Sequence, residues 1–366
     1  MDCDIIIVGG GPAGAACGTL LARAGLRVLI CEKAEFPREK ICGECVNPRS
    51  WRYFEALGVA EQLRALNLRG VESFRVTAMD GTSASGTIPT LPGSPFFSIS
   101  RSVLDSLLLS NARESGASVL NAAGVVNIQR TSDWQVTTVS GEKFTARFLV
   151  GADGRNSLVA RIVSNRKERT SRTDERVGVQ WHTALQARIG SAVEMFLFDS
   201  GYGGVVNVGN SRANIALVTR PDIAQLAQRN FLLFLDKTLF RNFTARQRLE
   251  SPTPVGDIHT AFPITPTLHR SISPTAFLIG DARQTVEPFT GEGIFFALQD
   301  AFLVAEKILP RYGKSYPVRP VRAYRWFANA LVSPSLRNPA IAHRIVRIAS
   351  RAPVTAQTVL QYLFFA

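Results

Sequence analysis

The segment from Asp4 to Glu32 constrains the fold of this chain more than any other. The apolar run Ile5–Val8 leads directly into a glycine pattern, Gly9-x-Gly11-x-x-Gly14, and a helical stretch follows. Glycine at these positions allows a tight turn, a close approach of the backbone to a pyrophosphate and close packing of helix on strand. A second apolar run, Leu26–Cys31, ends at Glu32, where an acidic side chain can bind ribose hydroxyls. The segment predicts a strand–helix–strand unit that binds a dinucleotide.

Two further motifs lie far along the chain, and each follows an apolar, strand-like run. The first contains Asp153 and the second contains Asp281. A dehydrogenase that binds only NAD needs neither motif, whereas FAD has a ribityl chain that a carboxylate such as Asp281 can hold. Gly291 and Gly293 then open an apolar helical stretch at Ile294, whose free N–H groups and dipole suit an electron-rich ring. Together the three motifs predict FAD as the cofactor.

The segments between these motifs indicate that the dinucleotide unit is interrupted. Residues 104–112 repeat apolar residues at helical spacing, and strand-like runs follow at 117–128 and 134–139. Residues 71–99 and 175–220 alternate apolar and polar residues, or are rich in Val, Phe and Thr. This pattern predicts antiparallel strands inserted into the α/β unit.

The expected fold class is therefore α/β. It combines a glutathione-reductase-type (Rossmann-like) FAD-binding domain with an inserted antiparallel β-sheet substrate domain and a C-terminal helical segment. The expected boundaries are 1–70, 100–160 and 270–312 for the discontinuous FAD-binding domain, 71–99 and 161–269 for the substrate-binding β-sheet domain, and 313–366 for a basic C-terminal helical region.

The ordered set of motifs resembles the flavoproteins of the para-hydroxybenzoate hydroxylase superfamily, and among them the geranylgeranyl reductase family. It comprises Gly9–Gly14 with Glu32, Arg101 in Arg-x-x-Leu-Asp, Gly151–Arg155 and the segment 280–294, and it spans about residues 1–300. The Trp-x-Trp-x-Ile-Pro motif of the related flavin halogenases is absent from the sequence.

The segment Phe36-Pro-Arg-x-Lys-x-Cys42-Gly43 is similar to the Cys-Gly segment near the flavin in geranylgeranyl reductases. Those enzymes usually carry more glycine after the Cys-Gly pair, whereas Glu44 and Cys45 follow it here.

The motifs and the resemblance together give the residues that we expect to bind FAD. Val125 would contact the adenine through its backbone, and Gly293 and Ile294 would lie beside the ring. The full set is Gly9, Gly11, Pro12, Ala13, Gly14, Glu32, Lys33, Cys42, Gly43, Arg101, Val125, Asp153, Asp281, Gly291, Gly293 and Ile294.

The resemblance implies an FAD-dependent oxidoreductase that reduces a carbon–carbon double bond of an isoprenoid or other lipid-like substrate. NAD(P)H or another reductant would act as a transient electron donor. Cys42 and Cys45 are the candidate catalytic residues, because a thiol beside the flavin can protonate the second alkene carbon. Tyr202 and His182 are further candidates for this acid. Two alternatives stay open: a monooxygenase that hydroxylates an aromatic or polyketide-like substrate through a C4a-hydroperoxide, and a non-catalytic lipid carrier on the same fold.

Composition describes an ordinary globular protein, with 46% apolar and 19% charged residues. All five cysteines lie within the first 45 residues, which favours reduced thiols over a disulfide framework. A strand begins almost at Met1 and no run approaches the roughly 20 apolar residues of a membrane span, so we expect a cytoplasmic protein without a secretory signal. The four histidines show no metal-ligand spacing.

The net charge of +13 is concentrated at the C-terminal end, where ten Lys or Arg and no Asp or Glu follow from Lys307 onwards. No recognition motif supports nucleic-acid binding. Apolar residues interleave with Arg344, Arg347 and Arg351. This pattern suits a helix that lies on an anionic membrane, peripheral to its inner face, or that caps an apolar cavity, and equally a solvated basic helix packed on its own domain.

The expected substrate is small and apolar or aromatic, and the sequence gives no oligomeric state. Four phenylalanines would line an apolar cavity if they faced inward, and would otherwise pack in the core: Phe196, Phe198, Phe295 and Phe296.

Overall fold

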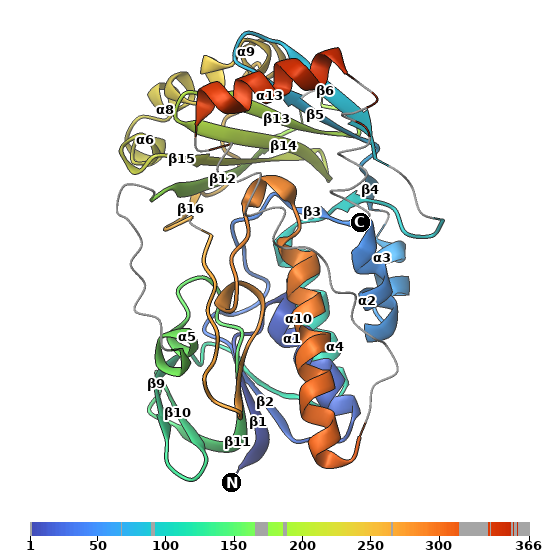
Figure 1. The fold of residues 1–366 in the computed structure, drawn as a ribbon, viewed down its shortest axis with the longest axis vertical. Helices are drawn as coiled ribbons and strands as arrows, with labels where there is room; N and C mark the ends of the chain where they lie inside the picture. Colours follow the sequence, from blue (N-terminus) through green and yellow to red (C-terminus); the bar gives the residue numbers. More distant parts are fainter. Residues whose placement is uncertain are drawn as a thin grey trace.

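The fold is seen in a computed structural model of the chain. It describes residues 2–66, 68–88, 92–164, 175–185, 189–264, 266–314, 336, 338–352, 354 and 357. Two large sheets lie at opposite ends of the long axis of the molecule, with long helices beside the lower one (Figure 1).

The lower sheet, called the β1 sheet, has the strand order β8-β2-β1-β11-β10-β9, and β17 also pairs with β11. β1 lies parallel to β2 and β11, and β17 is parallel to β11, as expected for a dinucleotide-binding unit. The strands are β1 Cys3–Val8, β2 Val28–Cys31, β8 Ser118–Leu120, β9 Val125–Arg130, β10 Trp134–Thr138, β11 Lys143–Gly151 and β17 Ala276–Leu278.

Both faces of the β1 sheet are covered, because successive residues of β1 point to opposite sides. Ile5 and Ile7 pack into a core with the three long helices, whereas Ile6 and Val8 pack with the short helix α5. The helices are α1 Pro12–Arg23, α4 Arg101–Glu114, α10 Gly293–Ile308 and α5 Leu158–Val163.

The upper sheet, called the β13 sheet, has the order β16-β12-β15-β14-β13-β5-β6. One face packs against the helices α6–α9, and the opposite face looks toward the lower half of the molecule. The strands are β5 Ser73–Thr77, β6 Ser83–Thr87, β12 Val177–Ala184, β13 Ala192–Phe198, β14 Gly201–Gly209, β15 Arg212–Thr219 and β16 His259–Ala261. The helices are α6 Pro221–Ala224, α7 Leu226–Arg229, α8 Phe231–Lys237 and α9 Phe243–Arg248.

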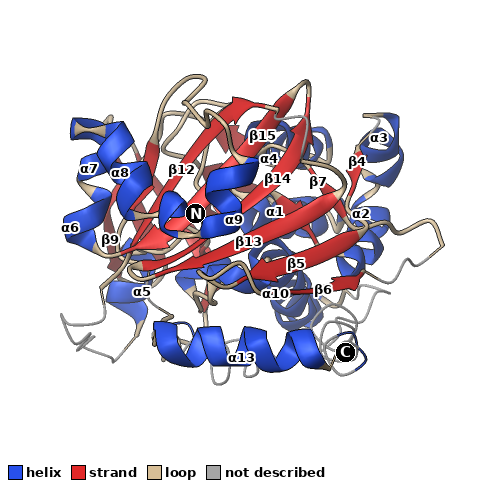
Figure 2. Ribbon diagram, turned by 90° about the horizontal axis from the view of Figure 1, so that it is seen from above, coloured by secondary structure: helices blue, strands red, loops and turns tan. Residues whose placement is uncertain are grey.

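The remaining elements join the two sheets or cover their edges. α13 runs along one edge of the β13 sheet beside β5 and β6 (Figure 2). A small sheet has the order β3-β7-β4. These elements are β3 Cys45–Val46, β4 Arg69–Gly70, β7 Phe97–Ser98, α2 Trp51–Leu57, α3 Ala60–Ala65, α13 Pro339–Arg351, and the 3₁₀ helices η1 Pro48–Ser50, η3 Leu239–Arg241, η4 Gly280–Ala282, η5 Pro288–Thr290 and η6 Leu309–Tyr312. Among the described residues, no helix combines the length and the apolar character that crossing a bilayer requires.

The structure confirms the α/β fold class and corrects two details. The predicted run 117–128 is two strands, β8 and β9, because the chain turns through a left-handed Ala122 (φ 51°) and continues on the opposite edge of the sheet. The strands of the β13 sheet were all expected to be antiparallel, but β5 is parallel to β13. More than 110 residues separate these two strands, so no hairpin dictates their direction. The expected domain boundaries stay a prediction.

Candidate active site

A polar cleft of about 810 Å³ opens at the carboxyl ends of β1, β2 and β11. The glycine loop forms one wall, where Gly9 has a left-handed backbone (φ 103°). A side chain at position 14 is excluded, because its Cβ would lie 1.9 Å from the Gly9 carbonyl oxygen. α1 starts at Pro12 without a side-chain cap, so the backbone N–H groups of its first turn are available to an anion in the cleft.

A row of charged side chains leads from the lining of this cleft into the protein interior. Glu32 Oε2 accepts a hydrogen bond from Gly10 N at 2.6 Å and thereby fixes the glycine loop. Arg38 lies 4.0 Å from Glu32 and 3.1 Å from the buried carboxylate of Asp105. Asp105 in turn binds the guanidinium of Arg101 through two hydrogen bonds, of 2.8 and 2.7 Å. This row links the glycine loop to the N-terminus of α4.

The cleft also holds cationic side chains, and two of them bury one nitrogen that has no hydrogen-bond partner within the described part of the protein. Arg38 Nη1 and Arg155 Nη1 are buried without a hydrogen-bond partner. Arg155 Nε lies 3.8 Å from Asp281 at the far end of the cleft. Burial, followed by the charge of Arg101, lowers the pKa of Lys40 to about 8. A buried N–H without a partner is costly, so this arrangement fits an anionic ligand such as a dinucleotide pyrophosphate.

The structure brings most of the predicted FAD-binding residues into one region. Asp153 lines the cleft, but its carboxylate also accepts hydrogen bonds from Ser157 Oγ at 2.5 Å and Leu158 N at 2.7 Å, at the start of α5. FAD contact by each predicted residue stays a prediction. Gly9, Gly11, Glu32, Lys33, Val125, Asp153 and Asp281 line the cleft; Cys42, Gly43 and Gly291 line a neighbouring cavity; Pro12, Ala13 and Gly14 form the first turn of α1; Arg101 is buried at the start of α4; Gly293 and Ile294 begin α10.

The neighbouring cavity, of about 110 Å³, is apolar and lies under the inner face of the β13 sheet. Ile41 and Arg155 line both the cavity and the cleft, so the two meet at the loop that carries Cys42. The other residues that line the cavity are Cys42, Cys45, Phe74, Phe96, Val193, Met195, Tyr202, Val205, Val206, Ala216, Leu217, Val218, Ile264, Pro288 and Phe289, and the glycines 43, 178, 204 and 291.

The four phenylalanines considered from the sequence lie elsewhere. Phe196 and Phe198 point to the outer face of the β13 sheet and pack with α8, and Phe295 and Phe296 pack in the core around α1. Core packing is therefore the correct alternative for all four residues.

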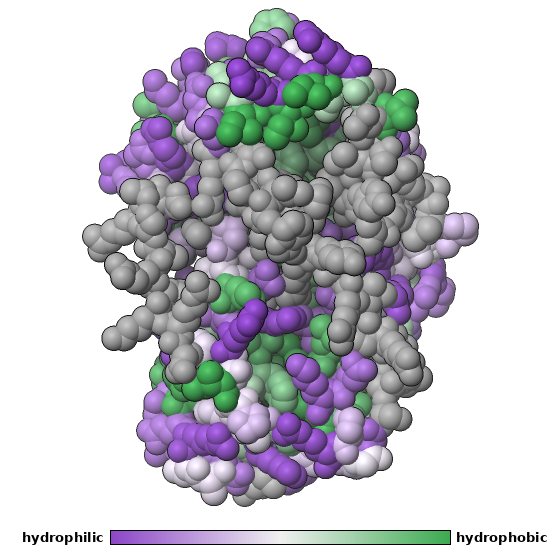
Figure 3. Space-filling view, viewed as in Figure 1, coloured by the Kyte–Doolittle hydropathy of each residue, from purple (hydrophilic) through white to green (hydrophobic). Residues whose placement is uncertain are grey.

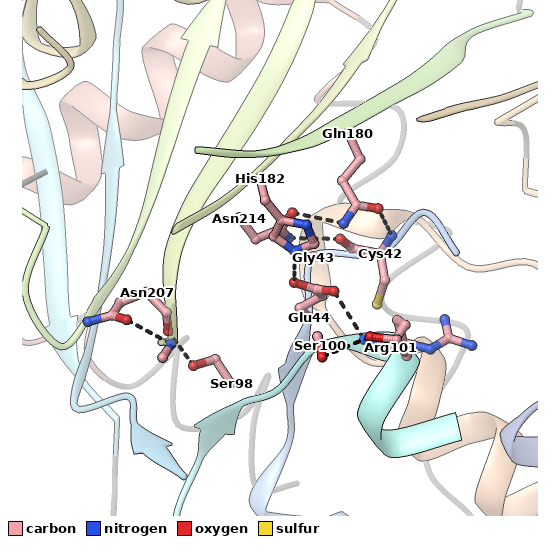
Figure 4. A network of polar contacts seen from close by, with 12 residues as sticks. Cys42, Gly43, Glu44, Ser98, Ser100, Arg101, Gln180, His182, Asn207 and Asn214 are labelled. Carbon is pink, nitrogen blue, oxygen red and sulfur yellow. Dashed lines mark hydrogen bonds and ion pairs between the residues drawn. The ribbon is translucent and has the colours of Figure 1, made fainter. Parts of the chain in front are cut away.

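The loop at Cys42 is tied to two strands of the β13 sheet by side-chain amides (Figure 4). Gln180 Oε1 accepts a hydrogen bond from Cys42 N at 3.0 Å, and Asn214 Nδ2 donates to the Cys42 carbonyl at 2.9 Å. Gln180 Nε2 also donates to Asn214 Oδ1 at 2.9 Å. The two amides thus hold the backbone of Cys42 between the cleft and the cavity.

Glu44 is the second anchor of this loop, and it is fully buried with a left-handed backbone (φ 56°). Its Oε2 lies 2.8 Å from His182 Nε2 on β12, and its Oε1 accepts from Arg101 N at 3.1 Å (Figure 4). The hydrogen bond to Glu44 raises the pKa of His182, although burial opposes this shift. His182 is therefore a partnered residue that joins the sheet to the loop.

The two candidate thiols differ in their surroundings. All five cysteines are free, and Cys42 is half-buried. The Cys42 thiol points toward Arg101 (Figure 4). Burial disfavours the charged guanidinium of Arg101, but Asp105 and, after it, Cys42 raise the pKa of Arg101. Cys45 is buried, its Sγ donates to the Gly43 carbonyl at 3.3 Å, and burial raises the pKa of its thiol far above the usual range. Only Cys42 has a cationic partner for a thiolate.

Tyr202 projects from β14 into the wall of the cavity, where its ring packs edge-on against Phe289. Its hydroxyl donates to Glu287, whose carboxylate also binds Arg176 Nη2 at 2.8 Å. Burial and the charge of Glu287 raise the pKa of Tyr202 well above its ordinary value. The hydroxyl is thus directed at Glu287.

Several site residues escaped sequence reasoning, namely Gln180, Asn214, Glu287 and the anchoring role of Glu44. Gln180 and His182 are two residues apart on β12, so they point to the same face of the sheet, but no sequence signal pairs them with a loop 138 residues earlier. Arg38 and Lys40 lie in the segment that leads to Cys42-Gly43, and their positive charge is the sequence feature that could have indicated an anion-binding role. Across the described residues, no group of three His, Cys, Asp or Glu side chains could hold a metal ion.

Several known proteins are similar to this chain in sequence or in fold. Residues 2–315 match the family described as "FAD binding domain". The chain is 30% identical over 326 residues to a menaquinone reductase of Mycobacterium tuberculosis, covering 83% of this chain and 76% of that protein. It is 25% identical over 322 residues to digeranylgeranylglycerophospholipid reductase 1 of Methanothermobacter thermautotrophicus, covering 83% and 76%. The structure of the flavin-dependent brominase Bmp2 shares the fold, with a TM-score of 0.78 at 20% identity, covering 99% of this chain and 93% of that one.

Proposed function

The chain belongs to the FAD binding domain family, and on this premise we propose that it is an FAD-dependent reductase that saturates a carbon–carbon double bond of an isoprenoid or other lipid-like substrate. The observation that carries the proposal is the apolar cavity beside the polar cleft, with Cys42 where the two meet. Arg155 is the one charged side chain among its described lining residues, so an apolar group suits it. The relatives named menaquinone reductase and digeranylgeranylglycerophospholipid reductase are both named for lipids.

In this proposal, different residues of the cleft bind different parts of the cofactor. The first turn of α1 and the unpartnered Nη1 of Arg38 would hold the pyrophosphate, and Glu32 would bind the adenosine ribose. Asp281 would bind the ribityl chain. Gly43 and Gly291 would let the ring approach the cavity, because both line it without a side chain. The uncapped start of α10 at Gly293 would stabilise negative charge on the ring.

Cys42 is the proposed proton donor. Bound, reduced FAD would supply the hydride equivalent for one alkene carbon. Cys42 would give its thiol proton to the other alkene carbon, and solvent would reprotonate the thiolate. The guanidinium of Arg101, held by Asp105, stabilises the thiolate. Cys45 lines the same cavity, but we favour Cys42 because the Cys45 thiol already donates a hydrogen bond to the Gly43 carbonyl.

Anaerobic single-turnover kinetics test this assignment. The protein is loaded with FAD, reduced with NADPH or dithionite and mixed with geranylgeranyl-bearing lipids, and mass spectrometry follows the gain of two hydrogens per double bond. Cys42→Ser should slow this step by roughly 100-fold or more and leave flavin reduction unchanged. The matched variant Cys45→Ser should retain most of the activity. Equal effects of both variants would remove Cys42 from the mechanism, and turnover that requires oxygen and an aromatic substrate would replace the reductase with a monooxygenase.

A further inference from the structure

Helix α13 is attached to the wall of the apolar cavity. Ala342 and Val346, one turn apart, are buried on the β13 sheet. They share a hydrophobic cluster with Phe74 and Met195, and both of these residues line the cavity. The helix therefore packs on the same hydrophobic cluster that forms part of the wall of the cavity, which the proposed function assigns to the substrate.

A second face of α13 carries apolar side chains to the surface. Ile341 is 45% exposed, Ile345 48% and Ile348 67%. Their spacing of four and three residues places them in one stripe, about 100° around the helix from the buried residues. The space-filling view shows apolar residues gathered in this region with hydrophilic residues next to them (Figure 3). Three adjacent exposed isoleucines form a patch of the kind that marks an interaction site.

Positive charge borders the stripe. Arg344 and Arg351 are exposed and lie within the same turns, on the side away from the sheet. Arg347, farther around the helix, binds Asp80 at 2.6 Å and so attaches the helix to the turn between β5 and β6. From Lys307 to the end of the chain the sequence contains ten basic and no acidic residues. A partner of this surface must accordingly be apolar and negatively charged.

We propose that the stripe of Ile341, Ile345 and Ile348, with Arg344 and Arg351, binds an anionic phospholipid bilayer. The isoleucines enter the boundary between headgroups and acyl chains, and the arginines bind lipid phosphates. This inference rests on the proposed function in one respect. A lipid-like substrate resides in a bilayer, and binding through α13 would bring the cavity close to that bilayer.

Vesicle flotation with the full-length, FAD-loaded protein tests the proposal. The vesicles contain phosphatidylcholine alone or mixed with phosphatidylglycerol. The double variant Ile345→Ser/Ile348→Ser should reduce partitioning onto mixed vesicles by at least about tenfold. The variant Arg344→Gln/Arg351→Gln should lose roughly fivefold per arginine on mixed vesicles and nothing on neutral ones. Leu232→Ser is the matched control, because Leu232 is 72% exposed on α8, away from α13, and should leave partitioning unchanged.

The outcomes separate this inference from the proposed function. Loss of partitioning in the α13 variants, with normal flavin absorbance and normal turnover of a short, water-soluble isoprenoid, supports it. Equal binding to neutral and anionic vesicles, or equal loss in Leu232→Ser, overturns it. Absence of vesicle binding by the unmodified protein, together with a dimer that the isoleucine variants convert to a monomer, overturns it in favour of a contact between two copies. Failure to reduce any isoprenoid would refute the proposed function while leaving the flotation result intact.

Discussion

The contact between Glu44 and His182 gives a prediction whose size and pH dependence both follow from the structure. Glu44→Gln keeps the shape of the side chain and can still accept from Arg101 N. It replaces the carboxylate that lies 2.8 Å from His182 Nε2 with a neutral amide. A hydrogen bond to a charged group contributes about 1.5–3 kcal/mol, so we expect the variant to lose about 2 kcal/mol of unfolding free energy when His182 is protonated.

The pH range of this loss follows from the direction of the pKa shift. The hydrogen bond to Glu44 raises the pKa of His182 in the folded state above its ordinary value of 6.5. A pKa that is raised on folding adds stability. This stability is fully present below the pKa of the unfolded state and disappears as pH rises through the pKa of the folded state. The difference between the wild-type protein and Glu44→Gln should therefore be largest below about pH 6.5 and shrink steadily in alkaline buffer.

Two measurements check this prediction. Urea unfolding of the FAD-loaded proteins at several pH values gives the stability difference, and NMR of ¹³C-labelled histidine gives the titration of His182 directly, assigned with His182→Asn. The sequence has only four histidines, so the signals can be separated. A His182 that titrates at or below 6.5 in the wild-type protein, or a stability difference that is constant with pH, would refute the assignment.

Three further predictions concern the cleft. Arg38→Met should raise the dissociation constant of FAD by roughly tenfold or more in fluorescence titrations, because a buried cation with a free Nη1 is lost; an unchanged constant would mean that phosphate binds elsewhere. FAD affinity should fall above pH 8, because Lys40 is then deprotonated and loses the charge that attracts the anion. Lys40→Met should remove this pH dependence. Gly14→Ala should yield protein without FAD, as judged by visible absorbance, because the new Cβ would lie 1.9 Å from the Gly9 carbonyl oxygen. The control variant Gly70→Ala should retain the cofactor, because the space around Gly70 is open.

Local patterns predicted the parts of the fold that depend on local rules. The glycine loop, the strand before it and α1 were placed almost to the residue, because strand, turn and helix signals agree there. The match to the FAD binding domain family confirms FAD as the cofactor and the superfamily resemblance.

Contacts between distant segments could not be predicted. The parallel pairing of β5 with β13 and the facing of Phe196 depend on register within a sheet, and a shift of one residue reverses which side chains face inward. The anchors of the Cys42 loop come from β12 and β15, so their role is visible only in three dimensions. The motifs that line the site were therefore predictable from the sequence, whereas the residues that hold the Cys42 loop in place were not.

The pairing of early strands with late ones also affects synthesis on the ribosome. β5 must wait for β13, at residues 192–198, and the β1 sheet is complete only when β17, at residues 276–278, has emerged. A nascent chain shorter than this exposes unpaired strand edges, which favour aggregation. We therefore expect chaperones to protect those edges until translation has passed residue 278. We also expect the two fragments from a gene cut between β6 and β13 to stay in solution only when they are produced together.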